Sequence, residues 1–123
     1  MREILRVESL TKTFKDFTAI DNINFIIRND GIHGLLGTNG AGKTTLMGMI
    51  LGLIKPTLGK ITIFEKNLEF ERFEILKHVN FTSPYLDLPK KLTVEENLQF
   101  YARLYGVKHI KDTIDKLASD LNI

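Results

Sequence analysis

Apolar and polar residues alternate with a period near two along two stretches near the start of the chain. Leu5 and Val7 alternate with charged neighbours, and Ile23, Phe25 and Ile27 repeat the spacing further on. Because successive side chains of a strand point to opposite faces, this alternation predicts two β-strands. Shorter and more apolar runs predict further strands at residues 32–36, 60–64 and 79–82.

Helical spacing of apolar residues replaces the alternation in two places in the first two thirds of the chain. The residues after Gly42 are helical in character as far as Ile54, where the run KPTLGK interrupts them. Apolar residues also recur at helical spacing just after the predicted 60–64 strand, at Phe70, Phe73 and Leu76. The pattern therefore predicts an α/β fold in which strands and helices alternate.

The last third of the chain has the pattern of two helices. Thr93 and Glu96 have the spacing of a capping box, in which hydroxyl and carboxylate each satisfy an otherwise unpaired backbone N–H. The apolar stripe that follows predicts a helix ending at Gly106. A second stripe predicts a further helix over residues 110–121.

Composition narrows the class of protein without naming its partner. The chain has 123 residues, of which 43% are hydrophobic and 26% charged, as in an ordinary soluble domain. A net charge of +2 is too small to argue for nucleic acid or an anionic membrane as a partner. No cysteine is present, and neither a signal peptide nor a membrane-spanning run is recognisable, so we expect a cytoplasmic protein.

The run GTNGAGKT, residues 37–44, satisfies the P-loop pattern G-x-x-x-x-G-K-[ST] in full. Its glycines let backbone N–H groups curl around an anion, and the following helix offers its unpaired N-terminal amides to phosphate. We expect Lys43 to reach the β- and γ-phosphates and Thr44 to coordinate Mg²⁺ through its hydroxyl. The alternative is a Gly-rich turn that binds nothing.

With its flanking residues, this loop resembles a known family. The runs GLLGTNGAGKTTLMGMILGLIKPTLGKITIF and LTVEENLQFYARLYG are similar to the N-terminal part of ATP-binding cassette (ABC) transporter ATPases, most of all exporter subunits with a separate permease chain. The resemblance implies an incomplete P-loop NTPase fold, with a β-subdomain and P-loop core over residues 1–83 and the start of a helical subdomain over residues 84–123. It also implies ATP and Mg²⁺ as ligands.

The resemblance assigns individual residues to the nucleotide. In the run LTKTF it places Phe14 where the family has an adenine-stacking aromatic, with Phe17 as the second candidate and a core role as the alternative. Lys43 is the residue assigned to catalysis, through charge stabilisation. The complete set expected to contact the nucleotide is Phe14, Gly37, Thr38, Asn39, Gly40, Ala41, Gly42, Lys43, Thr44 and Thr45.

One position departs from the family pattern. Where relatives place a glutamine that touches Mg²⁺ and the attacking water, this chain has Ser83 or Pro84. A serine hydroxyl can bind a metal directly or through water, so Ser83 is a second metal candidate, with an ordinary loop serine as the alternative. The three histidines, at positions 33, 78 and 109, show no metal-ligand spacing.

Two family motifs are missing from the sequence. It contains neither an S-G-G signature nor an apolar run ending in Asp-Glu, which would supply a metal ligand and a general base. We therefore expect the chain to stop inside the helical subdomain and to hydrolyse ATP very slowly or not at all. We also expect self-association, because the 32–36 strand would lack its parallel neighbour.

The resemblance further implies a setting for the full-length protein. It would sit at the inner face of the cell membrane, bound to a transmembrane permease and paired head to tail with a second ATPase subunit. The main alternative is a nucleotide-binding remnant or regulatory module that never hydrolyses ATP. A small-molecule kinase or GTPase is disfavoured, because the chain has no N-K-x-D motif and strands precede its P-loop.

Overall fold

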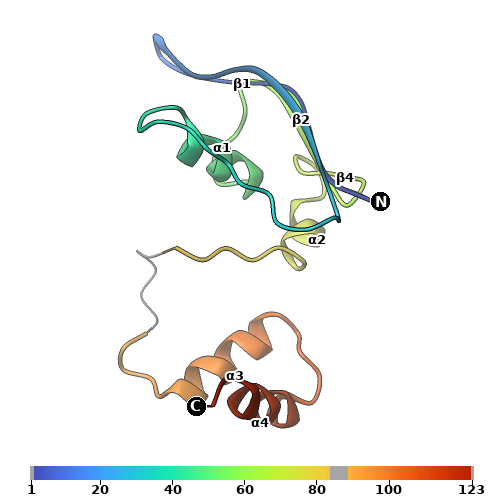
Figure 1. The fold of residues 1–123 in the computed structure, drawn as a ribbon, viewed down its shortest axis with the longest axis vertical. Helices are drawn as coiled ribbons and strands as arrows, with labels where there is room; N and C mark the ends of the chain where they lie inside the picture. The colour runs from blue at the N-terminus through green and yellow to red at the C-terminus, as the bar shows by residue number, and fades with distance from the viewer. Residues whose placement is uncertain (1, 84–88, 123) are drawn as a thin grey trace. The chain divides into compact units, whose positions relative to one another are not determined.

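The structure, a computed structural model, describes residues 2–83 and 89–122. Contacts within the chain divide it into two compact units, Met1–Asn80 and Phe81–Ile123. In Figure 1 the colours of the first unit run from blue to yellow, and those of the two helices of the second run from orange to red. None of the helices in these described ranges has the length and apolar character needed to cross a membrane.

The first unit is built on an antiparallel sheet with the strand order β2-β1-β3-β4. Its strands are β1 (Glu3–Phe14), β2 (Phe17–Arg28), β3 (Leu58–Ile63) and β4 (Lys66–Asn67). β1 and β2 form a long hairpin whose register shifts at several points, each a bulge or irregularity. The predicted strands of the first 28 residues and the predicted 60–64 strand are thus confirmed, with β3 starting two residues early.

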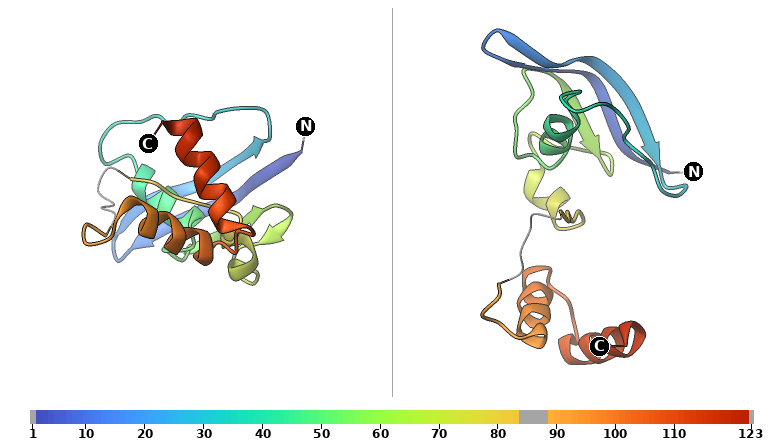
Figure 2. Two further views of the ribbon diagram at one scale, coloured as in Figure 1. Left: turned by 90° about the horizontal axis from the view of Figure 1, so that it is seen from below. Right: turned by 60° about the vertical axis from the view of Figure 1, so that its left-hand side comes forward.

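Two helices, α1 (Lys43–Ile50) and α2 (Arg72–Leu76), share a hydrophobic core with the sheet. Leu46 and Met49 of α1 and Ile75 of α2 are buried in it. The views in Figure 2 agree that α1 lies alongside the sheet. The sheet contributes the remaining buried residues of this core, Leu5, Val7, Leu10, Ile20, Ile61 and Ile63, and Leu68 follows β4.

α1 is shorter than the predicted helix, which extended to Ile54. The helix stops because Gly52 adopts a left-handed backbone with φ of 66°. The Gly52 amide donates to the Met49 carbonyl at 3.0 Å, and the Leu53 amide donates to the Gly48 carbonyl at 2.8 Å. This pair of bonds is a Schellman motif, which satisfies the last carbonyls of a helix and ends it.

Two strand predictions are wrong. Residues 32–36 and 79–82 have no regular secondary structure. Ile32 is 104% exposed and Leu36 92% exposed, so the apolar run of the first segment is not buried. A strand needs a hydrogen-bonded neighbour, and among the described residues the strands pair only with one another, which leaves these apolar runs without a ladder to join.

The second unit contains α3 (Val94–Leu104) and α4 (Ile110–Leu121). The predicted capping box is confirmed, since the Thr93 hydroxyl accepts from the Glu96 amide at 3.2 Å and the Glu96 carboxylate accepts from the Thr93 amide at 2.7 Å. Asn97, which the pattern did not single out, is buried and donates through its amide to the carbonyls of residues 89, 92 and 93. It ties the preceding loop to α3.

Gly59 of β3 offers a test of how tightly the sheet is assembled. Its φ is 83°, and a Cβ there would collide with the backbone carbonyl oxygens of Glu8 and Ser9 on β1. We expect Gly59→Ala to lower the free energy of unfolding by about 3 kcal/mol, because it combines backbone strain with overpacking. Circular dichroism during urea titration, without nucleotide, measures the loss.

Gly40→Ala is the matched control, because Gly40 has a φ of 84° but no atom lies within 4 Å of the position that a Cβ would take. The control isolates the backbone strain, which is of the order of 1 kcal/mol or more. Equal losses in the two variants would contradict the close approach of β3 to β1.

Candidate nucleotide-binding site

The P-loop connects the irregular segment after β2 to the first turn of α1. Gly40 and Gly42 have φ values of 84° and 83°, a left-handed conformation that favours glycine. Gly42 also packs against β2, since a Cβ there would lie 2.5 Å from the Ala19 carbonyl oxygen and 2.7 Å from Ile20 Cδ1. The loop therefore needs glycine at this position both to turn and to let the start of α1 touch the sheet.

The N-terminus of α1 presents amides to solvent. The first helical hydrogen bond runs from the Leu46 amide to the Gly42 carbonyl at 2.8 Å. Within the part of the chain that the structure describes, the amides of Lys43, Thr44 and Thr45 have no acceptor, and neither a side-chain cap nor an acidic residue occupies this end. Unpaired amides and the positive end of the helix dipole together favour an anion here.

Lys43 folds back over the loop from which it starts. Its ammonium donates to the Gly37 carbonyl at 2.6 Å and to the Thr38 carbonyl at 2.7 Å. These bonds join the two ends of the loop and hold the positive charge of Lys43 next to Gly37 and Thr38. Both acceptors are neutral carbonyls, and a phosphate oxygen is a stronger acceptor for an ammonium, so the side chain can exchange one for the other.

The remaining loop residues lie exposed around this charge. Residues 37–41 and Thr44 are exposed, and Thr45 is partly buried. No residue within 2–83 or 89–122 makes a hydrogen bond to the Thr44 hydroxyl, which leaves it able to coordinate a cation beside a bound phosphate. The loop can thus hold a polyphosphate and its metal, although it offers no general base.

Two aromatic side chains lie at the turn of the β1–β2 hairpin. Phe14 and Phe17 are cross-strand partners, 45% and 63% exposed. Ala19, whose carbonyl meets Gly42, is two residues beyond Phe17, and a strand rises about 3.3 Å per residue. The structure therefore brings the predicted aromatic residues to the part of the sheet that the P-loop touches, and the core alternative for Phe14 is disfavoured by its exposure.

Lys12 is a residue of this region that the sequence pattern did not identify. Its ammonium lies 4.8 Å from the centroid of the Phe14 ring and donates to the Lys55 carbonyl at 2.8 Å. Lys12 lies within the run LTKTF that carries the resemblance at Phe14, but the resemblance assigned no contact to the lysine itself.

The other metal candidates are not brought to the loop by contacts within the first unit. Ser83 belongs to the second unit, Phe81–Ile123, and Pro84 lies outside the described residues. His33 Nε2 lies 2.9 Å from the Asp30 carboxylate, and His78 packs edge-on against Phe64. Among the residues that the structure describes, no group of histidine and carboxylate side chains could hold a metal by itself.

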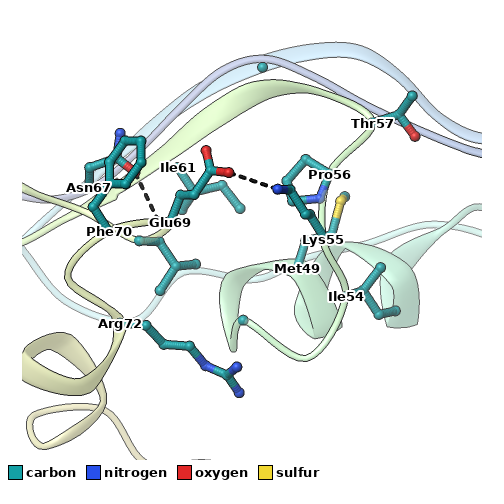
Figure 3. A pocket seen from close by; sticks show the side chains of 13 residues that line it. Met49, Ile54, Lys55, Pro56, Thr57, Ile61, Asn67, Glu69, Phe70 and Arg72 are labelled. Atoms are coloured by element: carbon teal, nitrogen blue, oxygen red, sulfur yellow. Dashed lines mark hydrogen bonds and ion pairs between the residues drawn. The ribbon is translucent and has the colours of Figure 1, made fainter.

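A pocket of about 640 Å³ lies at the other end of α1 (Figure 3). Met49 and Ile61 contribute to its apolar lining, and the Lys55–Glu69 ion pair, at 2.8 Å, lies on its rim. The hydrogen bond with Glu69 raises the pKa of Lys55. None of the described lining residues belongs to the P-loop, so this pocket is separate from that loop.

Comparison with known proteins places the chain in a family. The family model described as ABC transporter matches residues 20–123. The bacitracin transport ATP-binding protein of Bacillus licheniformis is 38% identical over 117 residues, which are 95% of this chain and 38% of that protein. An uncharacterized ABC transporter ATP-binding protein of Bacillus subtilis (strain 168) is 34% identical over 123 residues, 100% of this chain and 40% of that protein.

A solved structure supports the same assignment. An ATP-binding subunit of an ABC transporter superposes with a TM-score of 0.78 at 27% identity, over 86% of this chain and 44% of that one. Of the two relatives named in the previous paragraph, the chain spans only 38–40% of the length. The predicted fold class, α/β with an N-terminal antiparallel sheet and part of a P-loop ATPase domain, is confirmed. The chain belongs to the ABC transporter family of ATP-binding proteins.

Proposed function

We propose that this chain binds ATP and Mg²⁺ at its P-loop, as the nucleotide-binding part of an ABC transporter ATPase. One observation supports the proposal above all. The Lys43 ammonium is hydrogen-bonded to the glycine-rich loop, next to the unpaired amides at the start of α1. An array of amides with one mobile cation is suited to a polyphosphate and to little else. Family membership favours ATP among the polyphosphates.

Each part of the loop has a distinct role in this proposal. The unpaired amides of residues 43–45 bind phosphate, Lys43 reaches the β- and γ-phosphates, and Thr44 binds Mg²⁺. Phe14 stacks on the base, with Phe17 as the second candidate. Ser83 is proposed as a further metal contact in place of the family's glutamine.

The larger setting is also a proposal, which rests on family membership. In the full-length protein, ATP binding and hydrolysis would be coupled to transport by a transmembrane permease at the inner face of the cell membrane. A second ATPase subunit, packed head to tail, would complete each nucleotide site. One relative is named for bacitracin transport, but the substrate of a transporter is selected by the permease, so no substrate is proposed for this chain.

Nucleotide affinity tests the site directly. We expect Lys43→Met to weaken the binding of ATP about 10- to 100-fold, because the variant loses charge-assisted hydrogen bonds to phosphate. Titration with a fluorescent ATP analogue measures the change. Lys60→Met is the control: it removes a lysine ion-paired with Glu8 at 3.0 Å on the sheet, and its ATP affinity should equal that of the unmodified chain.

The same titration tests the metal. Thr44→Val should abolish the gain in ATP affinity that Mg²⁺ provides, whereas Thr44→Ser keeps the hydroxyl and should keep the gain. A loop that binds no nucleotide, or a Lys43→Met variant with unchanged affinity, would refute the proposed function.

Hydrolysis by the isolated chain is a separate expectation, which is the same for part of an ATPase and for a non-hydrolysing nucleotide-binding module. Because the sequence has no S-G-G segment and no apolar run ending in Asp-Glu, we propose that the isolated chain releases phosphate at close to the background rate. A phosphate-release assay, with Lys43→Met as the blank, measures turnover. Vigorous release that depends on Lys43 would show that the chain carries a general base we have not identified.

Self-association is the last part of the proposal. The segment at residues 32–36 exposes Ile32, Leu35 and Leu36 and has no strand partner among the described residues. Exposed apolar side chains grouped in this way tend to associate with another chain. We expect multi-angle light scattering to detect species larger than the monomer, and Leu36→Lys to reduce them; a monodisperse monomer would count against the prediction.

A further inference from the structure

The contact between Lys12 and Phe14 joins a charge to the proposed base-stacking ring. The Lys12 ammonium lies 4.8 Å from the ring centroid, within the range of a cation–π interaction. The same ammonium also donates a hydrogen bond to the Lys55 carbonyl, at 2.8 Å. The cation therefore has two partners, a ring and a backbone acceptor, which limit the positions that it can adopt.

A ring with a cation over one face has one face left for stacking. Phe14 is 45% exposed, so its ring is accessible although Lys12 lies over it. Restricting an exposed side chain before a ligand arrives reduces the entropy lost on binding. Phe17, 63% exposed, makes no ring or cation contact within the described residues, so Phe14 is the better ordered of the two aromatic candidates.

The Lys55 carbonyl, which accepts from Lys12, belongs to a segment that also forms hydrogen bonds with the backbone of β1. The Thr57 amide donates to the Thr11 carbonyl at 2.9 Å, and the Thr13 amide donates to the Thr57 hydroxyl at 3.1 Å. Lys55 and Thr57, both labelled in Figure 3, follow the end of α1. The hairpin next to Phe14 is thus held by the segment after α1, while the start of α1 carries the phosphate loop.

We propose that Lys12 is a positioning residue of the nucleotide site, which holds the Phe14 ring with one face free for the base. The inference rests on the proposed function, because it takes ATP as the ligand and Phe14 as the platform. Lys12 contacts the Phe14 ring and the Lys55 carbonyl, neither of which belongs to the P-loop. It should therefore affect the binding of ligands that carry a base and leave the binding of base-free polyphosphates unchanged.

The test compares two ligands, ATP and inorganic tripolyphosphate, with Mg²⁺ present. Lys12→Met keeps the apolar stem and removes the charge, so it should weaken ATP about threefold, the size of an exposed cation–π contact, with no change for tripolyphosphate. Lys12→Arg keeps the cation and should restore ATP affinity. Isothermal titration calorimetry on the complete chain measures all of these affinities.

Lys15→Met is the matched control. Lys15 lies in the turn of the same hairpin with a φ of 49°, and its ammonium has no partner among the residues that the structure describes. The substitution removes the same charge from the same hairpin end, and we expect it to leave both affinities unchanged. A loss in this control equal to that in Lys12→Met would mean that net charge alone is responsible, which would overturn the inference.

The remaining outcomes separate the inference from the proposed function. If Lys12→Met weakens both ligands, Lys12 acts on the phosphates or on the fold, and the positioning role is overturned. If it weakens neither while Lys43→Met weakens both, the role is overturned and the proposed function stands. If the unmodified chain binds ATP no more tightly than tripolyphosphate, Phe14 does not stack on the base. The inference is then overturned together with the proposed role of Phe14. If it binds neither ligand, both fall.

Discussion

The approach of Gly42 to β2 fixes the geometry on which the proposed nucleotide site depends. There is no room for a Cβ between this residue and the Ala19 carbonyl, so the first turn of α1 lies directly against the sheet. Two residues before Ala19 on β2 is Phe17, and across the ladder from it is Phe14. One backbone contact therefore determines the spacing between the amides of the proposed anion site and a pair of aromatic rings. These are the two kinds of surface that a nucleotide requires.

Local patterns predicted the elements whose stability is local. The hairpin of β1 and β2 pairs neighbouring stretches of chain, so alternation was sufficient to find it. The capping box at Thr93 is likewise formed within one turn. The strand predictions for residues 32–36 and 79–82 were wrong. An apolar run becomes a strand only when a neighbouring strand supplies hydrogen bonds, and the run itself carries no information about that neighbour. α1 ends earlier than predicted because Gly52 adopts a left-handed conformation. The apolar residues after Gly52 continued the helical pattern, so the sequence did not reveal this end.

The candidate site was only partly predictable from the sequence. The spacing of the glycines and Lys43 identified the loop and the helix that follows it, whereas the hydrogen bonds of the Lys43 ammonium to the Gly37 and Thr38 carbonyls were not predicted. Contacts between distant parts of the chain were not predictable. The bond from Lys12 to the Lys55 carbonyl crosses 43 positions, and the approach of Gly42 to Ala19 crosses from helix to sheet. The individual roles of Phe14, Thr44 and Ser83 remain predictions, which rest on the family to which the chain belongs.

The shifts of register between β1 and β2 have a consequence for how this protein meets other chains. β2 is the outermost strand of the described sheet, and its pairing with β1 changes register at four points between Glu3 and Thr13. Bulged strands bend and twist more strongly than regular ones, so their free amides and carbonyls do not form a straight, evenly spaced row. A second strand can follow such an edge for only a few residues. The hairpin is thereby protected from edge-to-edge addition, and filament growth from this side of the sheet is disfavoured even though the strand is long.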